Sequence, residues 1–110
     1  MIKPEIFFTL LSDETRLRCL FLLQEKGELC VCDLIDALKM IQPKISRHLA
    51  LLRKYKVVTA TRRGTWMYYH ISNDLPDWAK KTLSFFAEMN QKDKPFSSDL
   101  KNLGKTCSSC

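Results

Sequence analysis

Residues 31–56 read VCDLIDALKMIQPKISRHLALLRKYK, and this stretch decides the fold. Its first part, VCDLIDALKM, has the apolar spacing of a short helix with one buried face. In its second part, Ile45, Leu49 and Leu52 recur at i, i+4 and i+7, which is one apolar stripe of a helix. Pro43 fits the first turn of that helix. Two helices joined by a turn of about four residues predict a helix-turn-helix.

The flanking segments extend this prediction to a winged helix. Residues 57–72, VVTATRRGTWMYYHIS, are rich in β-branched and aromatic residues and predict a β-hairpin with a glycine-containing loop. Upstream, we expect a short helix from Pro4 to about Leu11 and a largely buried helix over SDETRLRCLFLLQEKG, ending at Gly27. Downstream, DLPDWAKKTLSFFAEMN predicts one more helix. The fold class is therefore mainly α with a β-hairpin wing (α+β).

A chain of 110 residues makes one domain of ordinary size. We assign residues 1–90 to a winged-helix DNA-binding and dimerisation domain and residues 91–110 to a flexible, cysteine-containing C-terminal tail. The apolar face of the helix after the hairpin is broad, and with Ile2, Ile6, Phe7 and Leu10 it predicts a homodimer interface. Neither a membrane span nor a signal peptide is recognisable, so we expect a cytoplasmic protein with reduced cysteines.

The positive charge is concentrated in one block. The net charge is +6, but no acidic residue lies between Asp36 and Asp74, and that block alone carries +8. The remainder therefore carries −2, the difference between +6 and +8. A segregated basic block is typical of a nucleic-acid surface, and the alternative is an ordinary solvated basic face.

The second helix of the pair is the expected recognition helix, because the N-terminal residues of such a helix reach base edges. The polar candidates there are Gln42, Lys44, Ser46 and Arg47, with His48 at the margin. Glutamine bonds adenine and arginine bonds guanine in the major groove. Arg62 and Arg63, at the hairpin tip, are predicted to touch phosphates or the minor groove.

Two groups of residues have plainer interpretations. His48 and His70 fit hydrogen-bonded structural histidines better than catalytic ones. The hairpin aromatics Trp66, Tyr68 and Tyr69 allow base stacking on a single strand, but packing against the domain core is the favoured interpretation. No phosphate loop, nucleophile elbow or pair of carboxylates on one face is recognisable, so we do not expect an enzyme.

Residues 28–34, ELCVCDL, place Cys30 and Cys32 one residue apart at the start of the helix before the recognition helix. Residues i and i+2 of an ideal helix lie about 200° apart. Both sulfurs therefore reach one ion only if Cys30 lies in an extended lead-in or if the first turn unwinds. Core packing and a redox pair are alternatives. Cys19, in RCLFLL, fits a buried hydrophobe, whereas Cys107 and Cys110 fit either accessory ligands or a separate redox pair.

Several motifs together resemble the ArsR/SmtB family of metal-responsive bacterial repressors, and its arsenic-responsive branch most closely. They are LLSDETRLRCLFLL, GELCVCDL, QPKISRHLALLRKYKVV and RRGTWMYYHIS, which agree in order and spacing over roughly residues 5–90. The resemblance implies a winged-helix homodimer that binds a two-fold operator on double-stranded DNA. It further implies that arsenite or antimonite, bound to Cys30 and Cys32, is the inducer that releases the DNA, with no permanent cofactor.

The chain departs from the family pattern at informative positions. Ile35 stands where the arsenic-responsive branch has a third cysteine, so the third ligand would come from Cys107, Cys110, Cys19 or a small-molecule thiol. The histidine ligands of the family's zinc site and the N-terminal cysteines of its cadmium and lead sensors are not found. Soft thiolate ligands indicate a thiophilic effector. A redox-gated repressor, a cadmium- or lead-responsive repressor and a DNA-binding protein without effector are the alternatives.

Overall fold

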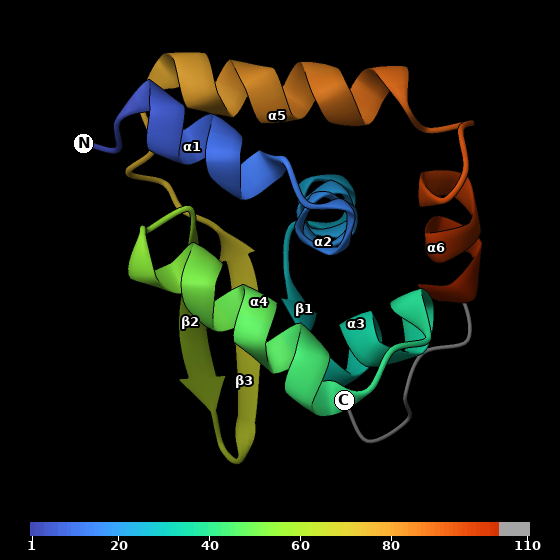
Figure 1. Cartoon of the computed structure of the whole chain (residues 1–110). Coiled ribbons are helices and arrows are strands. Elements are labelled where there is room, and N and C mark those ends of the chain that lie inside the picture. Colours follow the sequence, from blue (N-terminus) through green and yellow to red (C-terminus); the bar gives the residue numbers. More distant parts are fainter. Residues whose placement is uncertain (104–110) are drawn as a thin grey trace.

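The computed structural model of the chain describes residues 1–103, and its elements follow the order of a winged helix (Figure 1). The helices are α1 (Pro4–Leu11), α2 (Glu14–Lys26), α3 (Val31–Leu38), α4 (Gln42–Lys54), α5 (Asp77–Met89) and α6 (Phe96–Leu103). The strands are β1 (Leu29–Cys30), β2 (Val58–Arg63) and β3 (Trp66–Ile71). Within residues 1–103, no helix combines the length and apolar character that crossing a bilayer requires.

Helix α2 is the centre of the core, as the run CLFLL predicts. All five residues from Cys19 to Leu23 are buried. Asp13 caps the helix by accepting the backbone N–H of Arg16 at 3.0 Å. Gly27 ends it with a φ of +84°, a backbone conformation that favours glycine. The other helices and the sheet surround α2 in Figure 1.

The predicted helix-turn-helix is confirmed in α3 and α4. The stripe Ile45, Leu49 and Leu52 is completely buried and joins one hydrophobic cluster with Leu34 and Leu38 of α3. The two helices are linked by a short turn that starts at Lys39, whose backbone is left-handed. Because their apolar faces share one cluster, the position of α3 determines how α4 is supported.

The predicted hairpin is present, and a third strand joins it. β2 and β3 pair antiparallel from Val58↔Ile71 to Arg63↔Trp66. The two-residue strand β1 also pairs with β3, through Leu29↔Tyr69 and Cys30↔Tyr68. The sheet order is therefore β1-β3-β2. Strand β1 attaches the segment immediately before α3 to the wing.

Helices α1 and α5 pack side by side (Figure 1), and both carry apolar residues that were predicted to form a homodimer interface. The expectation is wrong for Phe7 and Leu10, which are buried in the chain's own core, whereas Ile2 and Ile6 are half-buried. On α5, one face is buried and consists of Ala79, Leu83 and Ala87. Four large side chains of α1 and α5 remain exposed: Phe8, Trp78, Phe85 and Met89.

The sequence prediction of a flexible tail from Gln91 onward differs from the structure, because residues 96–103 form α6. Phe96, Leu100 and Leu103 follow helical spacing, and the ring of Phe96 packs on Phe21 and Phe86 at centroid distances of 5.2 Å each. Asp99 is buried and pairs with Arg18 of α2. Three apolar side chains and the ion pair with Arg18 therefore hold a segment that its polar composition predicted to be mobile. Cys107 and Cys110 lie outside the described residues.

Candidate DNA-binding surface and thiol site

The start of α4 presents most of the predicted DNA-binding residues outward. Gln42, Lys44 and Arg47 are exposed, and Ser46 is half-buried on the same turns. This follows from the helix period, because these residues lie away from the buried stripe that begins at Ile45. The surface therefore offers amide, ammonium and guanidinium groups, which suit base edges and phosphates.

His48 faces the protein instead, and its side chain is 18% exposed. Its Nδ1 lies 3.3 Å from a guanidinium nitrogen of Arg16 and 3.9 Å from a carboxylate oxygen of Asp13. Burial lowers the pKa of His48 from its ordinary value of 6.5, and the nearby Asp13 carboxylate opposes this only partly. His48 therefore anchors α4 to the start of α2 as a neutral ring and does not extend the outward surface of α4.

His70 is likewise structural, as expected. Its Nε2 lies 2.7 Å from the hydroxyl of Thr59, its cross-strand partner on β2. Among the aromatics of the wing, Tyr69 packs against the hydrophobic core, which agrees with the favoured interpretation. Trp66 and Tyr68 are half-buried.

The two arginines of the wing have different surroundings. Arg62 is exposed at the end of β2. The guanidinium of Arg63 donates to both carboxylate oxygens of Glu28, at 2.5 and 2.9 Å, and lies 4.9 Å from the centre of the Tyr68 ring. Arg62 thus points outward from the wing, whereas Arg63 is held against its own domain. Sequence reasoning did not identify Glu28 as the partner of Arg63, because the two residues lie 35 positions apart.

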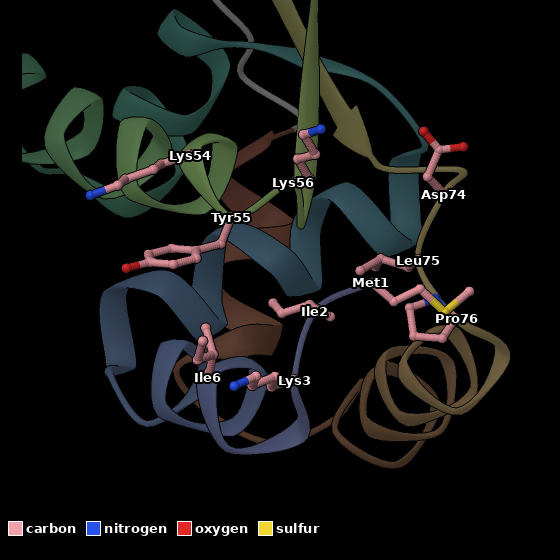
Figure 2. Close-up of a pocket in the computed structure, with 10 residues that line it drawn as sticks. All are labelled: Met1, Ile2, Lys3, Ile6, Lys54, Tyr55, Lys56, Asp74, Leu75 and Pro76. Carbon is pink, nitrogen blue, oxygen red and sulfur yellow. The ribbon is translucent and has the colours of Figure 1, made fainter.

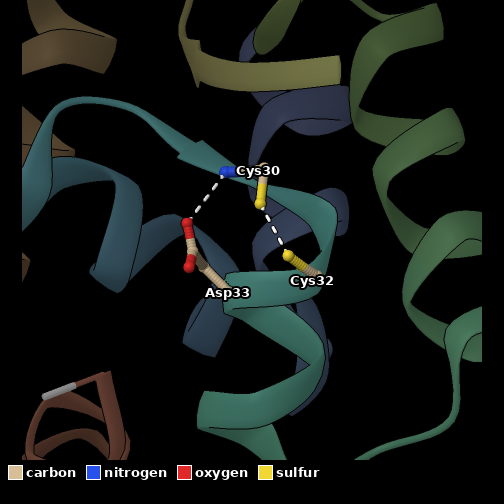
Figure 3. Close-up of side chains that lie close together, drawn as sticks. All are labelled: Cys30, Cys32 and Asp33. Atoms are coloured by element: carbon tan, nitrogen blue, oxygen red, sulfur yellow. Dashed lines mark hydrogen bonds between the residues drawn. The ribbon is translucent and has the colours of Figure 1, made fainter. Parts of the chain in front are cut away.

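Cys30 and Cys32 come together where β1 becomes α3 (Figure 3). Cys30 has extended backbone, with φ of −86° and ψ of 165°, and is the N-cap residue of α3. Of the two predicted geometries, an extended lead-in and an unwound first turn, the structure has the extended lead-in, and the two sulfurs lie 2.9 Å apart. Cys30 is buried, whereas Cys32 is half-buried. The two sulfurs are therefore close enough to bind one small soft ion.

Asp33 is a third group at this site, and sequence reasoning missed it. Its carboxylate accepts the backbone N–H of Cys30 at 3.2 Å and so caps α3. One potential ligand atom from each of Cys30, Cys32 and Asp33 lies within 4.8 Å of the others. The spacing of an acidic residue three positions after an N-cap was the signal available in the sequence.

The other cysteine in the described residues is unsuited to this site. Cys19 is completely buried in α2, and burial raises the pKa of its thiol to about 12. A thiol with that pKa stays protonated near neutral pH, and the thiolate is the ligand form. Ile35, at the position of the family's third cysteine, packs against the hydrophobic core. Cys19 therefore fits the role of a buried hydrophobe.

A cavity of about 510 Å³ lies elsewhere, among the start of α1, the end of α4 and the residues before α5 (Figure 2). Ile2, Ile6 and Leu75 contribute apolar surface, and the wall also includes Tyr55. Lys3, Lys54, Lys56 and Asp74 add charged groups to the lining. None of its lining residues is a cysteine, so the thiol site is defined by its sulfur atoms and not by this cavity.

The fold, the outward basic face of α4 and the arginine-bearing hairpin define a winged-helix DNA-binding protein. Residues 13–60 match the family described as bacterial regulatory protein, arsR family. The chain is 51% identical over 82 residues to the arsenical resistance operon repressor of Escherichia coli, and the match covers 74% of this chain and 70% of the relative. It is 46% identical over 92 residues to the arsenic resistance transcriptional regulator ArsR2 of Pseudomonas putida, covering 84% of this chain and 80% of the relative.

Solved structures agree with this assignment. The AntR antimony-specific transcriptional repressor superposes with a TM-score of 0.66 and 28% identity, over 80% of this chain and 77% of that one. The transcriptional regulator HlyU of Vibrio vulnificus gives a TM-score of 0.68 and 26% identity, over 77% and 84% of the two chains. This chain belongs to the arsR family of bacterial transcriptional regulators, and it is a DNA-binding regulator, not an enzyme.

Proposed function

We propose that this regulator is a homodimeric repressor that leaves its operator when trivalent arsenic or antimony binds Cys30 and Cys32. The observation that carries the proposal is the pair of sulfurs, 2.9 Å apart, at the start of the helix that supports the recognition helix. Relatives named for arsenic resistance, and a structural neighbour named antimony-specific, favour these two elements as inducers. Such a repressor acts in the cytoplasm, where its cysteines stay reduced.

The coupling between the thiols and the DNA follows from the shared core of α3 and α4. A ligand that draws both sulfurs to one ion reshapes the first turn of α3, where Asp33 already bonds the Cys30 backbone. Leu34 and Leu38 of that helix pack in the same cluster as Leu49 of α4. A 100-fold loss of operator affinity requires about 2.7 kcal/mol of coupling, which lies within the usual allosteric range.

The third ligand is proposed to be a tail cysteine, with a small-molecule thiol as the substitute. Asn102 near the end of α6 donates its side-chain N–H to the carbonyl of Ala37 on α3, at 3.0 Å. The five residues from Asn102 to Cys107 can extend about 17 Å. Cys32 lies five residues before Ala37, or about 7.5 Å along the helix. Chain length therefore permits Cys107, and Cys110 beyond it, to serve the site of the same subunit.

The exposed faces of α1 and α5 support a dimer. Phe8 is 51% exposed, Phe85 is 65% exposed and Met89 is 60% exposed, and together with Trp78 they leave a large apolar surface in a single chain. A two-fold dimer that buries this surface directs two recognition helices toward one face of a duplex. We therefore expect two half-sites about one helical turn apart, or a multiple of it.

The proposal is tested on an operator selected from a random-sequence duplex pool. Under strong reductant, arsenite and antimonite are expected to release the wild-type protein, while Cys30→Ser and Cys32→Ser, tested singly, still bind DNA but are not released. The matched control is Cys19→Ala, which removes the completely buried thiol of α2 and should respond normally. Cys107→Ser and Cys110→Ser are expected to weaken the response without abolishing it.

The same assay separates the alternatives. Cadmium, lead and zinc are titrated in parallel, and release by cadmium or lead alone would replace arsenic as the effector class. A redox switch would respond to oxidant and ignore arsenite under reductant. If both Cys30→Ser and Cys32→Ser are released as readily as the wild type, the thiol site is assigned to the wrong residues.

A further inference from the structure

The tip of the wing is tied to the segment that leads into the thiol site. Arg63, the last residue of β2, makes a two-pronged ion pair with Glu28, two residues before Cys30. The guanidinium also lies over the Tyr68 ring, so two groups fix its position. Planar guanidinium–carboxylate pairing is demanding in geometry, because both N–H···O bonds must align together.

The backbone makes a second connection over the same few residues. Leu29 and Cys30 pair with Tyr69 and Tyr68 of β3, so Cys30 is itself part of the sheet of the wing. The Cys30 sulfur faces Cys32 on α3, as Figure 3 shows. Residues 28–32 therefore touch the wing on one side and form the thiol site on the other.

We infer that Glu28 is a positioning residue that transmits inducer binding at Cys30 and Cys32 to the wing, by holding Arg63 only in the inducer-free arrangement. The inference rests on the proposed function. An ion held by both sulfurs displaces the residues next to Cys30, and a displacement at Glu28 separates the aligned pair. Release of Arg63 changes the position of the hairpin tip that carries Arg62, the exposed arginine of the wing.

The decisive measurement is the coupling ratio, defined as the operator Kd with arsenite divided by the Kd without it. Arg63 is 57% exposed and Glu28 is 33% exposed in their side chains, so the pair is screened by solvent. Glu28→Gln and Arg63→Gln are each expected to lower the ratio about two- to fivefold. The double variant should lower it no further, because both changes remove one interaction. The exchange Glu28→Arg with Arg63→Glu should restore the ratio.

Glu14→Gln is the matched control, since it removes an exposed carboxylate that pairs with Arg18 and not with an arginine of the wing. It should leave the coupling ratio unchanged. A second measurement needs no DNA. In a Trp78→Phe background the remaining tryptophan is Trp66, at the wing tip. Arsenite should shift its fluorescence, and adding Glu28→Gln should remove most of that shift.

The outcomes separate the two proposals. If the wild type shows no release by arsenite or antimonite, the proposed function fails and the inference fails with it. If the wild type is released but Glu28→Gln keeps the full ratio and the full Trp66 shift, only the inference is overturned. A ratio lowered as much by Glu14→Gln as by Glu28→Gln overturns it too, because general loss of a surface carboxylate would then be the cause.

Discussion

Replacing Asp99 by asparagine tests what holds α6 on the domain. The Asp99 carboxylate is 1% exposed and accepts two hydrogen bonds from the Arg18 guanidinium, both at 2.8 Å. The hydrogen bond to Asp99 is the main reason that the pKa of the Arg18 guanidinium is raised, and Arg18 therefore stays charged. Breaking a buried pair costs about 3–5 kcal/mol. Because Arg18 is 14% exposed and partly solvated, we expect a loss of about 2–4 kcal/mol.

Urea denaturation followed by far-ultraviolet circular dichroism measures the free energy of unfolding, and amide hydrogen exchange reports α6 separately. Glu14→Gln is the matched control: Glu14 also lies near Arg18, at 3.7 Å, but is 71% exposed, so its loss should change stability by less than about 0.5 kcal/mol. Replacing both partners, Arg18→Met with Asp99→Leu, should recover most of the loss. An Asp99→Asn protein as stable as wild type, with α6 amides still protected, would refute the reasoning.

Three further predictions concern α4. Burial lowers the folded-state pKa of His48, so the unfolded chain takes up the proton first as pH falls. The free energy of unfolding should therefore decrease below about pH 6.5, and less so in His48→Gln, in denaturation measured between pH 7.5 and 5. Arg47→Ala should weaken operator binding by about 1–3 kcal/mol and relax sequence discrimination, whereas Lys44→Ala should reduce the slope of binding against log salt by about one. Lys101→Ala on α6 is the control, and an equal effect there would contradict the assignment of α4 to DNA.

Local periodicity accounts for what could be predicted from the sequence. The stripe Ile45, Leu49 and Leu52 identifies the buried face of α4, and this same stripe identifies Gln42 and Arg47 as outward residues. The glycine-containing hairpin and the capped, apolar α2 are likewise local signals. The extended backbone at Cys30 was one of two geometries that allow the thiols to meet, and the structure has that one.

Long-range pairing accounts for what was missed. Strand β1 has two residues and exists only because β3, almost 40 residues later, pairs with it. Helix α6 depends on Arg18, 81 residues away from Asp99, and its own composition is mostly polar. His48 and Arg63 are residue types that suit DNA, yet each contacts a distant residue of its own domain, Arg16 and Glu28 respectively. No local pattern contains these partners.

The anchoring of α6 determines where the chain can be shortened. Arg18 bonds Asp99 and also donates to the carbonyl of Leu38 at 3.4 Å, so one side chain joins α2, α3 and α6. A truncation after Asn90 would remove Phe96 from the rings of Phe21 and Phe86 and deprive that guanidinium of its buried carboxylate partner. A deletion intended to remove only the terminal cysteines must therefore begin beyond Leu103, because α6 belongs to the folded domain.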